Sequence, residues 1–250
     1  MEHHNSILVL LMFLSSIFVG CLYEEQYESQ IDITVVPDMN NGTIIESYSD
    51  GEQVSASYVV IDFDFSQTTS GKKITTYGID TMDGRTPHTA AADTHSSISV
   101  EFYQHGVYNV SAFAIDEDNF QQNTSLLILI ELRIDWVESN TSDPIILTYN
   151  PTPVNGGPNP VLVEINSVVE NPRLIENIGG GGQSVEITWN LVDEQDGVCQ
   201  KKTTQIDDGQ SESWYTIHFN TFQVHELVVN YDEGQDYINV NHSIKIIYAD

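Results

Sequence analysis

Short runs of β-branched and aromatic residues, separated by turn-forming clusters, recur along the chain from residue 31 to its end. Such residues favour strands because branched and flat side chains pack well on a pleated surface. No segment after residue 21 keeps apolar residues at the i, i+3, i+4 and i+7 positions of a helix for three turns. The sequence therefore predicts an all-β protein. The expected strands are Ile31–Val36, Val54–Phe65, Ile98–Phe102, Tyr108–Ile115, Leu126–Ile134, Ile145–Tyr149, Val161–Val169, Val185–Val192, Trp214–Phe219, Val224–Tyr231 and Ile238–Tyr248.

Turn residues between these runs include Asn40-Asn41-Gly42, Ser49-Asp50-Gly51 and Asp83-Gly84. Strands at this spacing are typical of sandwiches, in which two sheets pack face to face. The length of 250 residues allows one or two domains. We expect two tandem Ig-like β-sandwich domains, at residues 31–134 and 135–250. The second is a diverged repeat of the first or a jelly-roll, with a buried tryptophan at Trp189.

The charge excludes one class of partner. The chain has 37 acidic and 8 basic side chains, so its formal net charge is -29. Proteins that bind nucleic acid by neutralising phosphates need clustered lysine and arginine. The adjacent basic pairs here are Lys72-Lys73 and Lys201-Lys202, which are too few to form a phosphate-binding groove. We expect no nucleic-acid partner.

The amino terminus predicts export. An apolar run, Ile7–Val19, ends at Gly20-Cys21 and is followed by acidic residues, which is the pattern of a secretory signal. Phe18-Val19-Gly20-Cys21 resembles a lipobox, the bacterial and archaeal motif whose cysteine is lipidated. The resemblance implies a signal peptide over residues 1–20, a lipid anchor at Cys21 and an acidic tether over 21–30. An ordinary signal peptide and an uncleaved membrane helix are the alternatives.

Glycan sequons agree with export to the cell surface. The N-x-[ST] tripeptide is an acceptor for N-glycosylation in exported proteins. An archaeal source would explain the lipobox, the sequons and the acidity together. The five candidate asparagines are Asn41, Asn109, Asn123, Asn140 and Asn241.

Residues 77–84 introduce a family resemblance. Tyr77–Gly84 (YGIDTMDG) resembles the Y-x-W-D-F-G-D-G signature of PKD (polycystic kidney disease) repeats, which are Ig-like sandwiches of surface proteins. Val100–Val110 is similar to the family's H-x-Y-x-x-x-G-x-Y-x-V segment, and Ala114–Asn119 to its closing turn. The match covers residues 51–132. It departs from the family at Ile79 and Thr81, where the family has Trp and Phe, and at Met82 and Asn119, where the family has glycines.

The resemblance implies structural roles for a set of motif residues. Alternate apolar residues would face inward, acidic side chains would cap turns, and two glycines would supply positive φ. A calcium ion held by Asp80, Asp83 and Asp116 is the functional alternative, and we expect no other cofactor. The motif residues are Tyr77, Ile79, Asp80, Asp83, Gly84, Gly106, Tyr108, Val110 and Asp116.

The search for catalytic motifs is negative. His225-Glu226 lacks the second histidine of H-E-x-x-H, and no G-x-S-x-G elbow or phosphate loop occurs. We expect Cys199 to be a free thiol without neighbouring histidines, and we predict no metal or catalytic site. The predicted function is a lipid-anchored, non-catalytic surface protein that presents its sandwiches to a protein or glycan. The alternative is an accessory module of a secreted protease or polysaccharide-degrading system.

Overall fold

The computed structural model describes residues 31–173, 182–234 and 237–249, and its regular secondary structure there is entirely β-strand. The all-β prediction is therefore confirmed. The signal peptide, the tether and Cys21 lie outside the described residues. In the part that the structure describes, no helix has the length and apolar character needed to cross a membrane. The strands are β1 (Ile31–Asp32), β2 (Val36–Pro37), β3 (Asn41–Ser49), β4 (Glu52–Ser57), β5 (Val59–Asp64), β6 (Thr69–Ser70), β7 (Ile74–Asp80), β8 (His88–Ala91), β9 (Ser97–Phe102), β10 (Gly106–Asp116), β11 (Gln121–Thr141), β12 (Leu147–Tyr149), β13 (Leu162–Glu170), β14 (Val185–Asp193), β15 (Val198–Ile206), β16 (Ser211–His218), β17 (His225–Glu233) and β18 (Ile238–Ile247).

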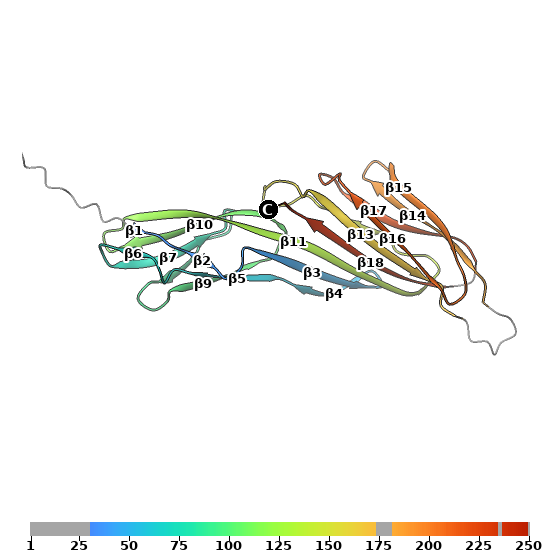
Figure 1. Ribbon diagram of the computed structural model, residues 1–250, viewed down its shortest axis with the longest axis horizontal. Coiled ribbons are helices and arrows are strands. Elements are labelled where there is room, and N and C mark those ends of the chain that lie inside the picture. The colour runs from blue at the N-terminus through green and yellow to red at the C-terminus, as the bar shows by residue number, and fades with distance from the viewer. Residues whose placement is uncertain (1–30, 174–181, 235–236, 250) are drawn as a thin grey trace, which may run out of the picture.

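A nine-stranded sheet runs the length of the molecule (Figure 1). Its strands follow the order β16-β13-β18-β11-β10-β7-β8, and the β3–β4 hairpin joins it through a parallel pairing of β3 with β11. A three-stranded sheet, β2-β5-β9, covers it toward one end, and a four-stranded sheet, β12-β17-β14-β15, covers it toward the other. A short β1–β6 pair completes the fold.

One strand, β11, connects the two ends. It has 21 residues, and at about 3.4 Å per residue it extends for about 70 Å. Its first half pairs with β10 and its second half with β18. The even-numbered residues from 128 to 138 are all buried, so the same face of β11 packs against the core along this stretch.

Aromatic contacts between the sheets form the core. Phe65, just after β5, stacks on Tyr77 of β7 with the ring centroids 4.6 Å apart. At the other end, the ring of Trp189 on β14 is fully buried and its Nε1 donates a hydrogen bond to Ser167 Oγ of β13 at 2.7 Å. The prediction of a buried tryptophan at Trp189 is therefore confirmed.

Several predicted strands differ from those observed. The segment 31–36 contains only the two-residue strand β1 and the first residue of β2. The run 54–65 is divided at Tyr58 between β4 and β5, which belong to different sheets. Within the predicted turn Asn40–Gly42, Asn41 and Gly42 are instead the first residues of β3. The strands β3 and β15 were not predicted, because each is rich in polar residues and lacks a long apolar run.

The predicted division into domains at residue 134 stays a prediction. That residue lies in the middle of β11, and the β3–β4 hairpin pairs beside the second half of this strand. Residues 41–57 therefore lie alongside strands from the carboxyl-terminal half of the chain.

Candidate functional site

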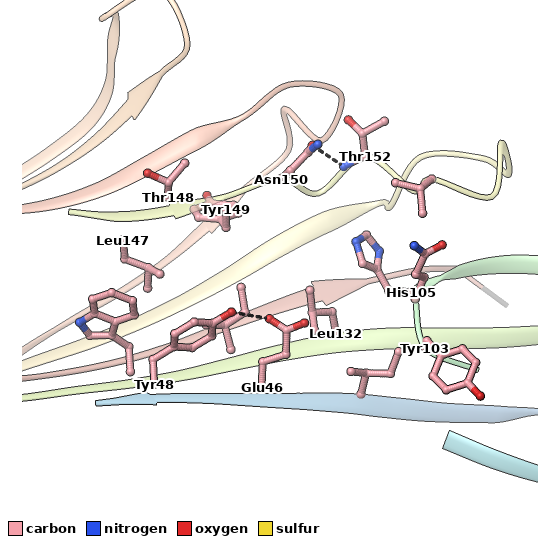
Figure 2. Close-up of a pocket in the computed structure, with 15 residues that line it drawn as sticks. Glu46, Tyr48, Tyr103, His105, Leu132, Leu147, Thr148, Tyr149, Asn150 and Thr152 are labelled. Atoms are coloured by element: carbon pink, nitrogen blue, oxygen red, sulfur yellow. Dashed lines mark hydrogen bonds between the residues drawn. The ribbon is translucent and has the colours of Figure 1, made fainter. Parts of the chain in front are cut away.

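A groove of about 330 Å³ lies where the two covering sheets fail to cover the nine-stranded sheet completely (Figure 2). The four-stranded sheet ends at its edge strand β12, whereas the sheet beneath it continues from β11 to β3 and β4. This mismatch leaves Glu46 and Tyr48, on the inward face of β3, only partly covered.

The floor of the groove consists of three side-by-side residue pairs. Because β3 and β11 are parallel and in register, alternate residues of the two strands point to the same face. The pairs are Ile44 with Leu132, Glu46 with Ile134, and Tyr48 with Trp136.

A stacked aromatic pair occupies one end of the floor. The rings of Tyr48 and Trp136 lie 5.4 Å apart at 27°. Trp136 is buried, and its Nε1 donates to Oε1 of the buried Glu138 at 2.7 Å. The same carboxylate accepts the backbone N–H of Ile145, its Oε2 lying 3.0 Å from that nitrogen. These bonds hold the tryptophan in place and keep the half-buried Tyr48 ring at the surface of the groove.

The roof and the end wall come from distant parts of the chain. Residues 147–154, which include β12, form the roof, and the turn 103–105 between β9 and β10 forms the end wall. His105 ties this wall to the sheet, since its Nδ1 lies 2.7 Å from the hydroxyl of Tyr248. The Asn150 side chain is oriented by a bond from the Thr152 backbone N–H to its Oδ1, at 3.0 Å.

The groove is lined mainly by apolar atoms and carries little charge. Burial lowers the pKa of His105 to about 4, against the opposing effect of the Asn150 backbone, so this imidazole is neutral at pH 7. Burial, together with the hydrogen bond and charge of Glu46, raises the pKa of Tyr48 to about 12. The Tyr48 hydroxyl donates to Glu46 Oε2 at 3.0 Å. Glu46 is the one carboxylate among the lining residues.

An exposed tyrosine, Tyr103, lines the groove, and a second exposed tyrosine, Tyr58, packs against it. Tyr103 is 50% exposed and Tyr58 is 44% exposed. Their rings meet edge to face with centroids 5.3 Å apart. Side chains of this kind offer a flat apolar face and a hydrogen-bonding tip to a ligand.

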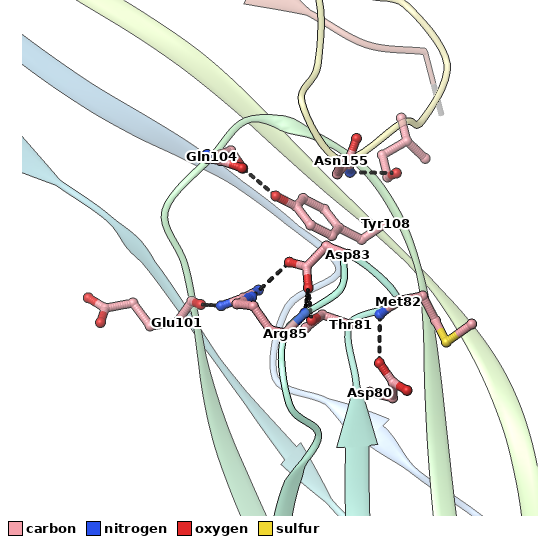
Figure 3. A network of polar contacts seen from close by, with 10 residues as sticks. Asp80, Thr81, Met82, Asp83, Arg85, Glu101, Gln104, Tyr108 and Asn155 are labelled. Atoms are coloured by element: carbon pink, nitrogen blue, oxygen red, sulfur yellow. Dashed lines mark hydrogen bonds and ion pairs between the residues drawn. The ribbon is translucent and has the colours of Figure 1, made fainter.

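The residues of the PKD-like motif lie outside this groove floor and make structural contacts (Figure 3). Asp80 Oδ1 accepts the backbone N–H of Met82 at 2.9 Å, and Asp83 accepts bonds from Thr81 and Arg85. Partial burial alone would raise the pKa of Asp83, but these hydrogen bonds and the Arg85 charge hold it below its ordinary value. The Arg85 guanidinium also donates to the Glu101 carbonyl at 2.8 Å.

The backbone has positive φ angles at the motif positions where PKD repeats have glycine. Gly84 has a φ of 89°, and Met82 and Asn119, where the family has glycines, have φ values of 57° and 64°. Gly106 has a φ of 153°, and a Cβ at this position would lie 2.6 Å from the side chain of Asn155. Its glycine therefore permits the loop after β12 to approach β10.

The apolar motif residues Tyr77, Ile79, Tyr108 and Val110 are all buried. The hydroxyl of Tyr108 donates to the carbonyl of Gln104 at 2.8 Å, four residues upstream. A tyrosine at the start of a strand that bonds back in this way is a feature of Ig-like sandwiches.

The calcium alternative is wrong for the proposed set of three carboxylates. Asp80 pairs with Ser111, whereas Asp116 lies five residues further along β10, which is about 17 Å. Asp116 Oδ1 instead accepts the backbone N–H groups of Asp118 and Phe120, at 2.9 and 3.0 Å. The three carboxylates cannot bind one cation.

All five sequon asparagines, Asn41, Asn109, Asn123, Asn140 and Asn241, are exposed. Their glycosylation stays a prediction.

The prediction for Cys199 was wrong on its surroundings. The thiol is exposed, and two histidines, His218 and His225, lie beside it.

Sequence reasoning missed the groove. Glu46 and Tyr48 lie on β3, which was not predicted as a strand, and their partners on β11 are 88 residues away in sequence. The alternation Ile44, Glu46, Tyr48 was the available local signal, since it places three side chains on one strand face.

Comparisons with known proteins give distant similarities only. No protein-family model and no curated protein matches the chain. Among solved structures, it is similar to one from work on the specificity of carbohydrate-binding modules of the β-sandwich superfamily, with 9% identity and a TM-score of 0.32 over 87% of this chain and 97% of that one. A Bacteroides ovatus protein of a mixed-linkage glucan utilization locus, SGBP-B, solved with a heptasaccharide, has 10% identity and a TM-score of 0.21 over 82% of this chain and 52% of its own. Tripeptidyl peptidase 2 has 10% identity and a TM-score of 0.21 over 86% of this chain and 20% of its own. At these scores the function has to be argued from the groove.

Proposed function

We propose that this chain is an exported, non-catalytic glycan-binding protein whose binding site is the groove between β3, β11 and β12. The groove itself is the observation that carries the proposal. Its volume of about 330 Å³ lies in the range of small-ligand sites, about 300–1,000 Å³. A stable protein partner would instead need about 800 Å² of surface on each side.

The chemistry of the groove matches a sugar. A pyranose ring has an apolar C–H face surrounded by hydroxyl groups, so it combines with an aromatic face and with neutral or acidic hydrogen-bonding groups. Tyr48 and Tyr103 supply the aromatic surface, and Glu46, Asn150 and Thr152 supply polar atoms. The net charge of -29 would repel a sulfated or uronic-acid polymer. We therefore expect a neutral glycan.

A binding role fits the groove better than hydrolysis. Glycosidases use two carboxyl groups on either side of the scissile bond. The lining residues include one carboxylate, Glu46, and an imidazole, His105, that stays neutral at pH 7.

The test is binding of the full chain to a panel of neutral and anionic polysaccharides, followed by calorimetry with oligosaccharides of the best ligand. We expect Tyr103→Ala and Glu46→Gln each to weaken binding about tenfold, which is about 1.4 kcal/mol. Preferential binding to insoluble polysaccharide would favour an accessory role in polysaccharide degradation.

A matched pair of controls lies elsewhere on the surface. Tyr215 donates to Glu164 at 3.2 Å, as Tyr48 does to Glu46, but both residues lie outside the groove. Tyr215→Ala and Glu164→Gln should bind as the parent does. The proposal is contradicted if both pairs of variants lose glycan affinity equally, or if the parent binds no glycan. Release of reducing sugar during the assay would also contradict it.

Attachment at the membrane is the second part of the proposal. The apolar run 7–19 and Cys21 support a lipidated mature amino terminus, and a single acyl chain holds a protein only marginally, so stable attachment needs a lipid with several chains. Mass spectrometry of the mature protein from membranes should find a lipid-modified Cys21, and Cys21→Ser should release the protein. An unmodified Cys21 in membrane-extracted protein would exclude the anchor.

A further inference from the structure

Three potential metal ligands meet at one end of the four-stranded sheet. The sulfur of Cys199 and one ring nitrogen each of His218 and His225 all lie within 4.8 Å of one another. Cys199 follows the first residue of β15, and His225 is the first residue of β17. His218 is the last residue of β16, in the nine-stranded sheet. The cluster therefore bridges the two sheets.

The backbone presents the cysteine to the histidines. The pairing of β14 with β15 shifts register here, with Leu191 opposite Gln200 and Val192 opposite Val198. Cys199 is thus the extra residue of a β-bulge. Bulges redirect a side chain away from the regular alternation of a strand and are common beside functional sites.

A hydrogen bond holds His225 in the tautomer that can bind a metal through Nδ1. Nε2 of His225 lies 2.9 Å from the carbonyl oxygen of Asn220. A carbonyl only accepts, so Nε2 carries the hydrogen and Nδ1 of the neutral ring has the free lone pair. This Nδ1 is buried without a hydrogen-bond partner, on a residue that is 0% exposed. A carbonyl that orients the second nitrogen is the usual support of a metal-bound histidine.

The second histidine also has an unused nitrogen. His218 is 7% exposed, and its Nε2 is buried without a partner. The two imidazole rings meet edge to face, with centroids 4.5 Å apart. Burying two nitrogens without hydrogen-bond partners is unfavourable, and a cation between them would satisfy both.

We propose that Cys199, His218 and His225 bind a Zn²⁺ ion that links the two sheets. Thiolate and imidazole are ligands of Zn²⁺ and are poor ligands of Ca²⁺ or Mg²⁺. Zinc bonds of about 2.0–2.3 Å place tetrahedral ligand atoms about 3.3–3.7 Å apart, so the side chains must move inward by about 1 Å. Asp193 Oδ2 lies 4.0 Å from the Cys199 sulfur but outside the cluster of mutually close ligand atoms, so a water molecule completes the tetrahedral site.

The metal would also stabilise the roof of the groove. Tyr149 of β12 pairs directly with His225, and the centroids of the two rings lie 5.8 Å apart. Tyr149 also lines the groove. The zinc proposal itself does not depend on glycan binding.

The test is zinc binding by the full chain, stripped with a chelator and titrated with Zn²⁺ against a chromophoric competitor. We expect one Zn²⁺ per chain, and a higher melting temperature in Zn²⁺ than in chelator. Cys199→Ser, at an exposed position, should weaken binding at least about tenfold and abolish the rise in melting temperature. With Co²⁺ as the probe, the sulfur-to-metal charge-transfer band should be present in the parent and absent in Cys199→Ser.

Two variants serve as matched controls. Cys21→Ser makes the same substitution at the other cysteine, and His95→Gln removes an exposed histidine elsewhere; both should bind Zn²⁺ as the parent does. His225→Gln keeps a donor for the Asn220 carbonyl and removes the ligand nitrogen, so it should also lose zinc. The proposal is overturned if the parent retains no zinc, if Cys199→Ser binds it equally well, or if Ca²⁺ stabilises the chain as much as Zn²⁺ does.

Discussion

Ser167 lies between the two sheets of the carboxyl-terminal half, where its hydroxyl contacts two fully buried side chains. Its Oγ accepts the Nε1–H of Trp189 at 2.7 Å and lies 2.8 Å from Nδ1 of His242. A serine that accepts from the indole has its own hydrogen left to donate to Nδ1. This arrangement suits a neutral imidazole, and burial lowers the pKa of His242 to about 3.

Acid should therefore destabilise the protein through His242. The pKa of its ring is about 3 in the fold, against an ordinary value of 6.5, so the stability it contributes is full above pH 6.5 and is lost as the pH falls toward 3. Between pH 8 and 5 the loss is about 2 kcal/mol. His242→Asn, which cannot ionise, should be less stable at pH 8 but should lose about 2 kcal/mol less over this range. Denaturant titrations at several pH values measure the difference, and parallel curves for parent and variant would refute it.

At the scale of the elements, strands with an apolar face were predictable and polar strands were not. The first half of β10 alternates strictly between buried and less buried residues, and its pattern was evident in sequence. In contrast, β15 carries two lysines and contains no apolar run, and it was not predicted. It exists because it pairs with a neighbouring strand, and this pairing requires no apolar run in its own residues.

The change of sheet at Tyr58 also had no local signal. The run 54–65 is continuously β-forming, yet β4 pairs with β3 while β5 pairs with β9. Both pairings are antiparallel, and each partner lies in a different layer. A single strand cannot serve both layers, so the chain turns between them. The groove depends on this turn, because it places β3 and β4 beyond the edge of the four-stranded sheet.

For the whole molecule, the dominant property is an excess of negative charge. The chain has 37 acidic and 8 basic side chains, and its ion pairs include Lys72–Asp118, Arg85–Asp83, Arg133–Asp135 and Lys202–Glu212. Exposed pairs contribute about 0–1 kcal/mol each, so they do not offset the repulsion between the remaining carboxylates. Repulsion of this kind destabilises a compact state.

Salt should therefore stabilise the protein. The screening length falls from about 30 Å at 0.01 M to about 3 Å at 1 M salt. We expect the melting temperature to rise over this range, by about 2–4 °C for each kcal/mol of repulsion removed. NaCl and KCl should act equally, because screening depends on ionic strength. A melting temperature that is independent of salt, or that responds to one cation alone, would contradict this explanation.

The sequence alone was sufficient to predict that the protein is all-β, because its apolar residues alternate. It also predicted turns at Asp50-Gly51 and Asp83-Gly84, a buried Trp189 and an acidic surface. These properties arise between residues that are close in the chain. The groove and the Cys199 cluster are different, because each joins residues whose contact depends on pairing across long sequence separations. Ile44 meets Leu132 through the parallel pairing of β3 with β11, and His218 meets Cys199 through the packing of two sheets. Register and layer order are properties of the complete fold, and no short segment encodes them.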